Sequence, residues 1–114
     1  MAWGEIELED EVAAWLERLD EDDFGTASRY IDLLEERGVH LDEPYTRHLR
    51  GKLRELRFHL HGEQRRITYY IASERRIILL TTFRKTRARE EDEIRRAERA
   101  MDICVREHRH EEDQ

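Results

Sequence analysis

The chain has 114 residues, of which 38% are hydrophobic and 43% are charged, and its formal net charge is −7. This length suits a single compact domain, and the overall charge taken alone argues against a nucleic-acid-binding protein. The single cysteine, Cys104, excludes an internal disulfide bond and fits a reducing, cytoplasmic setting. We expect no signal peptide and no membrane segment, because no run approaches the roughly 20 apolar residues that span a bilayer.

The first third of the chain predicts one strand and two helices. Residues 2–7 alternate between polar and apolar side chains, as in a strand. Residues 10–19 place apolar side chains at helical spacing, and a second helix begins at the acidic run 20–23. Gly38 is expected to end that second helix. The short break between the helices predicts an antiparallel pair.

The rest of the chain predicts a connector, three strands and a last helix. Residues 39–50 contain the only proline and predict little regular structure. Residues 52–60, 65–72 and 76–83 predict an antiparallel meander, because short breaks with turn-forming residues separate them. Four consecutive acidic residues at 90–93 favour a helix that begins near Ala88. We therefore expect an α+β fold with helices on one face of an antiparallel sheet. A single domain should span residues 1–108, with a frayed polar tail at 109–114.

The charge is distributed unevenly along these elements. Residues 1–46 carry a balance of −12, residues 47–89 of +10 and residues 90–114 of −5. A basic middle segment can form a local patch that binds a polyanion. Alternatively, the acidic and basic segments pair with each other and no polyanion binds, and charge alone does not decide between the two.

Strand alternation predicts where the basic side chains gather. In residues 52–60, KLRELRFHL, the apolar Leu56 and Phe58 share one face, while Glu55, Arg57 and His59 share the other. The next strand should place Ile67, Tyr69 and Ile71 on the core face, and Arg66, Thr68 and Tyr70 on the face of Arg57. Four more cations leave the third strand, namely Arg84, Lys85, Arg87 and Arg89.

These cations could form one concave surface. Adjacent strands lie about 4.8 Å apart, so arginines on neighbouring strands can contact successive phosphates. The competing interpretation pairs them with Glu55, Glu63 and the acidic first turn of the last helix. Tyr70 is the better candidate of the two tyrosines to contact a ligand, because Tyr69 falls on the core face.

No metal or cofactor site is predicted. His59 and His61 can share a strand face but lack a third ligand at convincing spacing. The sequence has no glycine-rich phosphate loop and no defensible Ser/His/Asp arrangement. Cys104 lies on the apolar stripe of the last helix, which favours buried packing over a nucleophilic role.

Several motifs together resemble a known family. LDEPYTRHLRGKLRELRF, RRITYYI, IILLTTFRKTR and EIRRAERAM occur in this order between residues 41 and 101. They are similar to the phage Gp49-like branch of HigB toxins, within the RelE/ParE superfamily of toxin–antitoxin systems. The resemblance extends from the strand near Trp3 to Met101. Where many members have a doubled lysine after the phenylalanine, this chain has Arg84-Lys85-Thr86.

The resemblance implies a RelE-like fold, with two N-terminal helices, an antiparallel sheet and a C-terminal helix. It also implies an endonuclease that cleaves mRNA on the translating ribosome. A helix-turn-helix antitoxin of the HigA type would neutralise it, and a heterotetramer is one expected assembly. The basic positions of the family fall on Arg57, Arg66 and Lys85.

Metal-free RNA cleavage assigns roles to these residues. Arg57 and Arg66 suit stabilisation of the charged phosphorane, because guanidinium groups bind two phosphate oxygens and stay charged. His59 and Glu55 are competing candidates for the general base, and Lys85 could protonate the leaving oxygen. Further RNA contacts are expected from Arg54, Tyr70, Arg84, Arg87 and Arg89. Two alternatives stay open: a non-catalytic RNA- or protein-binding module, and a ParE-like gyrase inhibitor with the same fold.

Overall fold

The computed structural model describes the backbone of residues 1–112 and the side chains of residues 1–107. Its strands are Glu5–Leu8 (β1), Thr46–Arg50 (β2), Leu53–Leu60 (β3), Glu63–Ala72 (β4) and Arg76–Arg84 (β5). Its helices are Asp10–Glu17 (α1), Glu21–Arg37 (α2) and Glu90–Glu112 (α3). The strands form one sheet in the order β1-β5-β4-β3-β2. The predicted α+β class is confirmed, and the arrangement is consistent with a RelE-like fold.

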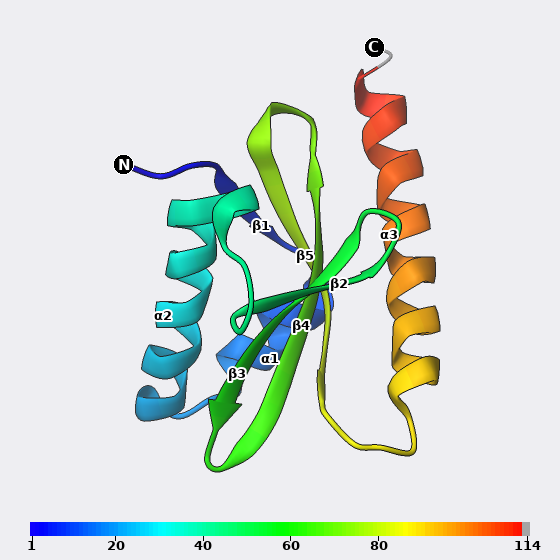
Figure 1. Cartoon of the computed structure of the whole chain (residues 1–114). Coiled ribbons are helices and arrows are strands. Elements are labelled where there is room, and N and C mark those ends of the chain that lie inside the picture. The colour runs from blue at the N-terminus through cyan, green and yellow to red at the C-terminus, as the bar shows by residue number, and fades with distance from the viewer. Residues whose placement is uncertain (113–114) are drawn as a thin grey trace.

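The helices lie on both faces of the sheet (Figure 1). On one face, Val12 of α1 and Leu34 of α2 belong to the same buried cluster as Ile67 and Leu79. On the other face, α3 packs on a second cluster, whose buried members are Leu53, Tyr70, Ile78, Leu80, Ala97 and Cys104. The prediction that helices cover one face only was wrong. The apolar run 77–80 in β5 is buried on both sides, so it needs a cover on each face.

The two edge strands differ from the sequence-based expectation. β1 pairs in parallel with β5, whereas the pairs among β2, β3, β4 and β5 are antiparallel, as predicted for the meander. Residues 46–50 form strand β2 on the free edge of β3, where a connector was predicted. Thr46 begins this strand fully buried, and its hydroxyl donates to the carbonyl of Leu41 at 2.6 Å. Hydrogen-bond pairing with β3 thus makes residues 46–50 a strand, although their own sequence pattern predicts little regular structure.

Helix boundaries follow the expected signals. The carboxylate of Asp20 accepts from the backbone N–H of Asp23 at 2.8 Å and caps α2. Gly38 ends α2 at a φ of +52°, and a side chain there would overlap the ring of Trp3. The acidic first turn of α3 begins at Glu90. This helix continues to Glu112 and enters the segment 109–114 that was predicted to fray, while residues 113–114 lie outside the described part.

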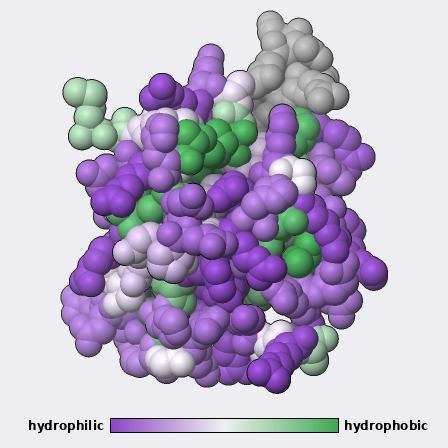
Figure 2. Space-filling view, in the orientation of Figure 1, coloured by the Kyte–Doolittle hydropathy of each residue, from purple (hydrophilic) through white to green (hydrophobic). Residues whose placement is uncertain are grey.

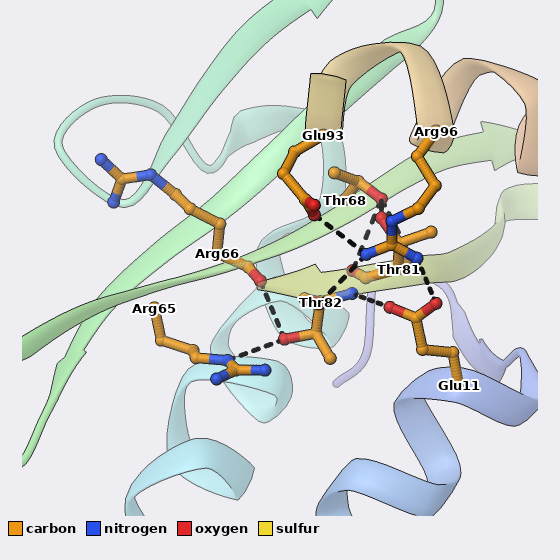
Figure 3. A network of polar contacts seen from close by, with 8 residues as sticks. All are labelled: Glu11, Arg65, Arg66, Thr68, Thr81, Thr82, Glu93 and Arg96. Carbon is orange, nitrogen blue, oxygen red and sulfur yellow. Dashed lines mark hydrogen bonds and ion pairs between the residues drawn. The ribbon is translucent and has the colours of Figure 1, made fainter. Parts of the chain in front are cut away.

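A polar network ties α3 and α1 to the end of the sheet (Figure 3). Arg96 of α3 pairs with Glu11 of α1 and, at 3.0 Å, with Glu93. Glu11 also accepts from the backbone N–H of Thr82 at 2.8 Å, beyond the point where β1 stops. The hydroxyl of Thr82 donates to the carbonyl of Arg66 at 2.9 Å. The backbone of Arg66 is therefore held from one side, while Figure 3 shows its guanidinium group pointing away from this network.

The outer surface is mostly polar. Figure 2 shows hydrophilic residues over most of the visible face, with apolar residues in small separate groups. Among the described residues, none of the helices combines the length and the apolar character that a membrane span requires.

Candidate functional site

Arg57 and Arg66 stand directly opposite each other on β3 and β4. Glu55 lies two residues before Arg57, so strand alternation turns its side chain to the same face. The predicted grouping of these three side chains is present in the structure. Glu55 Oε2 is 3.3 Å from Nε of Arg66 and 3.7 Å from Nε of Arg57. One carboxylate thus faces two guanidinium groups.

This triplet is largely removed from water. The side chains of Glu55 and Arg66 are 1% and 3% exposed, whereas that of Arg57 is 27% exposed. Within the described part of the chain, Glu55 Oε2 and Arg57 Nε are buried without a hydrogen-bond partner. Nε of Arg57 instead faces Glu55 Oε2 at 3.7 Å, an ion pair that is too long for a hydrogen bond.

Burial also changes the protonation equilibria. It raises the pKa of Glu55 above its ordinary value, although the nearby guanidinium groups of Arg66 and Arg57 act in the opposite direction. Burial lowers the pKa of Arg66, and the charge of Glu55 partly offsets that effect. Arginine starts so far above neutrality that Arg66 keeps its charge. The site therefore combines a fixed positive charge with a carboxylate that is harder to ionise than usual.

A cavity of about 280 Å³ opens beside the two arginines. Its lining residues are Tyr30, Pro44, Tyr45, Arg57, Phe58, His59, Gln64 and Arg66. None of these carries a carboxylate, so the electrostatic character of the wall is cationic. His59 is exposed and lines this cavity. A group of phosphate size could reach Arg57, which is 27% exposed, while Arg66 lines the same cavity with only 3% of its side chain exposed.

A second hollow adjoins the first at Gln64. Its walls are Glu63, Gln64, Arg84, Lys85, Thr86 and Arg87. Gln64 belongs to both linings, and its Oε1 accepts from Arg66 at 2.9 Å. The backbone N–H of Lys85 donates to the carbonyl of Gln64 at 2.9 Å. Gln64 therefore separates Lys85 and Arg87 from the arginine pair. The two groups line adjacent cavities and not the same one.

Two predicted RNA contacts are placed elsewhere. Arg54 pairs with Tyr69 on the face covered by α1 and α2, and it donates to the hydroxyl groups of Tyr69 and Thr46. Its alternation with Arg57 puts it on the opposite face from the cavity. Tyr70 is 2% exposed, and its hydroxyl donates to Cys104 Sγ at 3.2 Å beneath α3. The prediction that Tyr70 contacts a ligand was wrong, because α3 covers that face.

The other predicted cations lie at the margin. Arg84 pairs with Glu63 at 2.9 Å, and both side chains are more than half exposed. Arg89 is exposed just before α3 begins. The alternative in which acidic residues pair with the basic ones is thus partly realised. Glu63 pairs with Arg84, and the first turn of α3 pairs with Arg47 and Arg50 of β2.

Sequence reasoning missed five of the residues that line the first cavity, namely Tyr30, Pro44, Tyr45, Phe58 and Gln64. Gln64 was detectable, because it lies two positions before Arg66 on the same strand face. Tyr45 precedes β2, in the segment that was predicted to be irregular. Tyr30 comes from the middle of α2, and nothing in its helical spacing indicates that it meets β3.

Two further reactive groups lie outside the cavity. Asp20, Asp23 and His61 bring one ligand atom each to within 4.8 Å of one another, a group the sequence did not predict. One aspartate caps α2 and the other pairs with His61 at 2.8 Å, so both carboxylates already have partners. Cys104 is buried as predicted, and burial raises the pKa of its thiol to about 12. A thiol in that state is a poor nucleophile.

Comparison with known proteins identifies a related family. A family model described as phage derived protein Gp49-like (DUF891) matches residues 14–102. This span contains LRELR at 53–57, RITY at 66–69 and FRK at 83–85, together with every residue that lines the two hollows. A comparison with curated proteins gives no match.

Proposed function

Because the chain belongs to the Gp49-like family of HigB-like toxins, we propose that it is the toxin of a type II toxin–antitoxin system. The activity that we propose is cleavage of mRNA on the translating ribosome. The observation that carries the proposal is the pair Arg57 and Arg66, which face each other beside a cavity and share one carboxylate. Two fixed positive charges that line one cavity suit a phosphate group.

The proposed reaction uses the RNA's own hydroxyl as nucleophile. The 2′-oxygen attacks the adjacent phosphorus, the bond from phosphorus to the 5′-oxygen breaks, and a 2′,3′-cyclic phosphate and a 5′-hydroxyl result. A base takes the 2′-hydroxyl proton, and an acid returns a proton to the leaving 5′-oxygen. Arg57 and Arg66 stabilise the extra negative charge on phosphorus, so the positive charge that the reaction needs comes from guanidinium groups.

Accessibility separates the two candidates for the base. His59 is exposed and lines the cavity, so its imidazole can reach a bound RNA. Glu55 is 1% exposed and lies behind the arginines. We assign His59 as the base and Glu55 as a positioning residue that holds Arg57 and Arg66 in place. Lys85, across Gln64, is the proposed source of the leaving-group proton.

The proposed partner is a helix-turn-helix antitoxin of the HigA type. The support for it is the family membership and the motif resemblance, and a heterotetramer is the proposed assembly. Co-expression with the product of a neighbouring helix-turn-helix gene, followed by size-exclusion chromatography with light scattering, measures the stoichiometry. The proposal also requires that the co-expressed antitoxin restores growth.

Mapping RNA 5′ ends after brief induction tests the activity. Wild-type protein should create new mRNA ends within minutes, and these ends should disappear when an initiation inhibitor empties the mRNA of ribosomes. Arg66→Ala should abolish them, whereas Arg99→Ala, which removes an exposed arginine of α3, should leave them unchanged. Intact mRNA together with DNA breaks would contradict the nuclease and favour gyrase inhibition. RNA binding without new ends would indicate a non-catalytic module.

A further inference from the structure

The cavity beside the arginines is also lined by aromatic side chains, those of Tyr30, Tyr45 and Phe58. Tyr30 and Phe58 stack with ring centroids 5.0 Å apart and an interplanar angle of 12°. Tyr45 leans on Tyr30 with centroids 6.4 Å apart and an angle of 42°. Phe58 is 4% exposed, so it serves as the base of this stack, while Tyr45 remains 38% exposed. The outermost ring of the stack is therefore open to a ligand.

Tyr45 is held close to one of the phosphate-binding candidates. The backbone N–H of Arg57 donates to the carbonyl of Tyr45 at 2.8 Å, one residue before β2 begins at Thr46. The N–H of Tyr45 donates in turn to the carbonyl of Asp42 at 3.0 Å. Main-chain hydrogen bonds thus hold the backbones of Tyr45 and Arg57 side by side, and both residues line the cavity. A ligand that contacts both needs an anionic group and a flat apolar group joined by a short link.

We propose that Tyr45 is the stacking platform for one base of single-stranded RNA, next to the phosphate that Arg57 and Arg66 bind. This inference rests on the proposed function and adds a base-binding subsite to it. Single-stranded RNA fits, because its unstacked bases can lie on aromatic side chains while cations contact the backbone. The lining contains no carboxylate that would repel the phosphate. Gln64 offers an amide for the base edge or the sugar on the same wall.

Binding measurements with two matched ligands test the platform. The first ligand is a single-stranded eight-nucleotide RNA with 2′-O-methyl groups, which cannot be cleaved by 2′-oxygen attack. The second is an abasic ribose-phosphate strand of the same length and charge. The wild-type protein should bind the RNA more tightly than the abasic strand at equal salt. Fluorescence anisotropy with end-labelled strands measures both affinities.

Substitutions at Tyr45 should affect only the ligand that has bases. Tyr45→Ala should weaken RNA binding at least about fivefold, the lower end of the loss of one base–aromatic stack, and leave the abasic strand unchanged. Tyr45→Leu keeps an apolar side chain against Tyr30 and should show the same selective loss, whereas Tyr45→Phe should bind like wild type. Phe24→Ala removes another exposed aromatic ring, from the first turn of α2, and is the matched control.

The outcomes separate this inference from the proposed function. Arg66→Ala should weaken binding of both strands, because it removes a phosphate contact. If Arg66→Ala weakens both strands but the Tyr45 variants weaken neither, the platform is wrong while the phosphate site stands. If the wild type binds neither strand, the platform is overturned, whereas the nuclease proposal is decided by the mapping of mRNA 5′ ends. If Tyr45→Ala is selective and no mRNA cleavage occurs in cells, the platform stands and the nuclease proposal fails.

Discussion

Two groups of arginines occupy this fold, and their partners differ. Arg96 pairs with Glu11 and Glu93 and donates to the carbonyl of Thr82. Arg50 likewise has two carboxylates, Glu91 and Glu98. By contrast, Arg57 and Arg66 share the single carboxylate of Glu55. Arginines with a full set of partners join secondary-structure elements, whereas the pair with too few partners keeps the capacity to bind an anion.

This comparison separates structural from functional charges more clearly than net charge does. The basic segment 47–89 contains members of both groups, so its balance of +10 overstates the charge available to a ligand. Part of it is neutralised by the acidic first turn of α3. Of the remaining cations, Arg57 and Arg66 line the first cavity, while Arg84, Lys85 and Arg87 line the second hollow.

Replacing Arg66, one of the two arginines that share Glu55, should have the largest effect on activity. Arg66→Ala should reduce mRNA cleavage about 10²–10³-fold, the usual cost of losing one electrostatic contact in the transition state. His59→Ala should cost less, about 10²-fold, the lower end of the 10²–10⁴ range for one proton-transfer group. Single-turnover cleavage of a ribosome-bound message measures both rates.

Because Arg66 is buried, its removal could also perturb folding. Arg66→Lys is the second variant, since it keeps the charge but cannot bind two phosphate oxygens. It should remain folded by circular dichroism and still cleave slowly. Full activity of either Arg66 variant, or a larger loss for His59→Ala than for Arg66→Ala, would disprove the assigned order of roles.

Replacing a fully paired arginine should have the opposite result. Arg96→Ala should lower the free energy of unfolding by about 1–2 kcal/mol, because it removes charge-assisted hydrogen bonds that are partly screened by solvent. Cleavage per folded molecule should stay close to wild type. Urea denaturation measures the first quantity, and the cleavage assay with folded protein measures the second. A large loss of activity without a loss of stability would contradict the comparison.

The smallest expected effect concerns the shared carboxylate. Burial raises the pKa of Glu55, so the folded chain binds a proton more readily than the unfolded chain between the ordinary and the raised pKa. The contribution of Glu55 to stability is therefore present below its ordinary pKa and is lost as pH rises through the raised pKa. Glu55→Gln cannot ionise and should lack this decline.

Unfolding measured from pH 4 to pH 8 tests that difference. The variant should gain stability relative to wild type as pH increases, with most of the gain above the ordinary pKa of glutamate. Glu63→Gln changes an exposed carboxylate on β4 and serves as the matched control. A relative stability of Glu55→Gln that falls with pH would show that the two guanidinium groups outweigh the cost of burial.

Part of the site could be predicted from alternation alone. Side chains alternate between the two faces of a strand, so Glu55, Arg57 and Arg66 were predicted to share one face of the sheet. The structure confirms this prediction. The same rule places Arg54 with Leu56 on the opposite face, so its prediction as an RNA contact conflicted with the strand pattern. Tyr70 obeys the rule but is buried, because alternation indicates a face and does not say what covers it.

The remaining errors have physical causes. The apolar run Ile77–Leu80 predicts burial on both faces, and this signal for the position of α3 was present in the sequence. Strand β2 had no comparable signal, since β3 supplies its hydrogen-bond partners and short edge strands depend on such pairing. Tyr30 and Tyr45 meet only through tertiary packing of α2 against the start of β2, which no local spacing encodes.

The parallel pairing of β1 with β5 has a consequence for the order of assembly. Glu5 pairs with Arg76, so the first strand finds its neighbour only after most of the chain exists. Contacts between residues this far apart in sequence form late in folding, because the intervening chain loses entropy when its ends meet. The β3–β4 hairpin with Arg57 and Arg66 is local by comparison. During synthesis, the cationic pair can thus form before the sheet edge and α3 that fix it in the finished molecule.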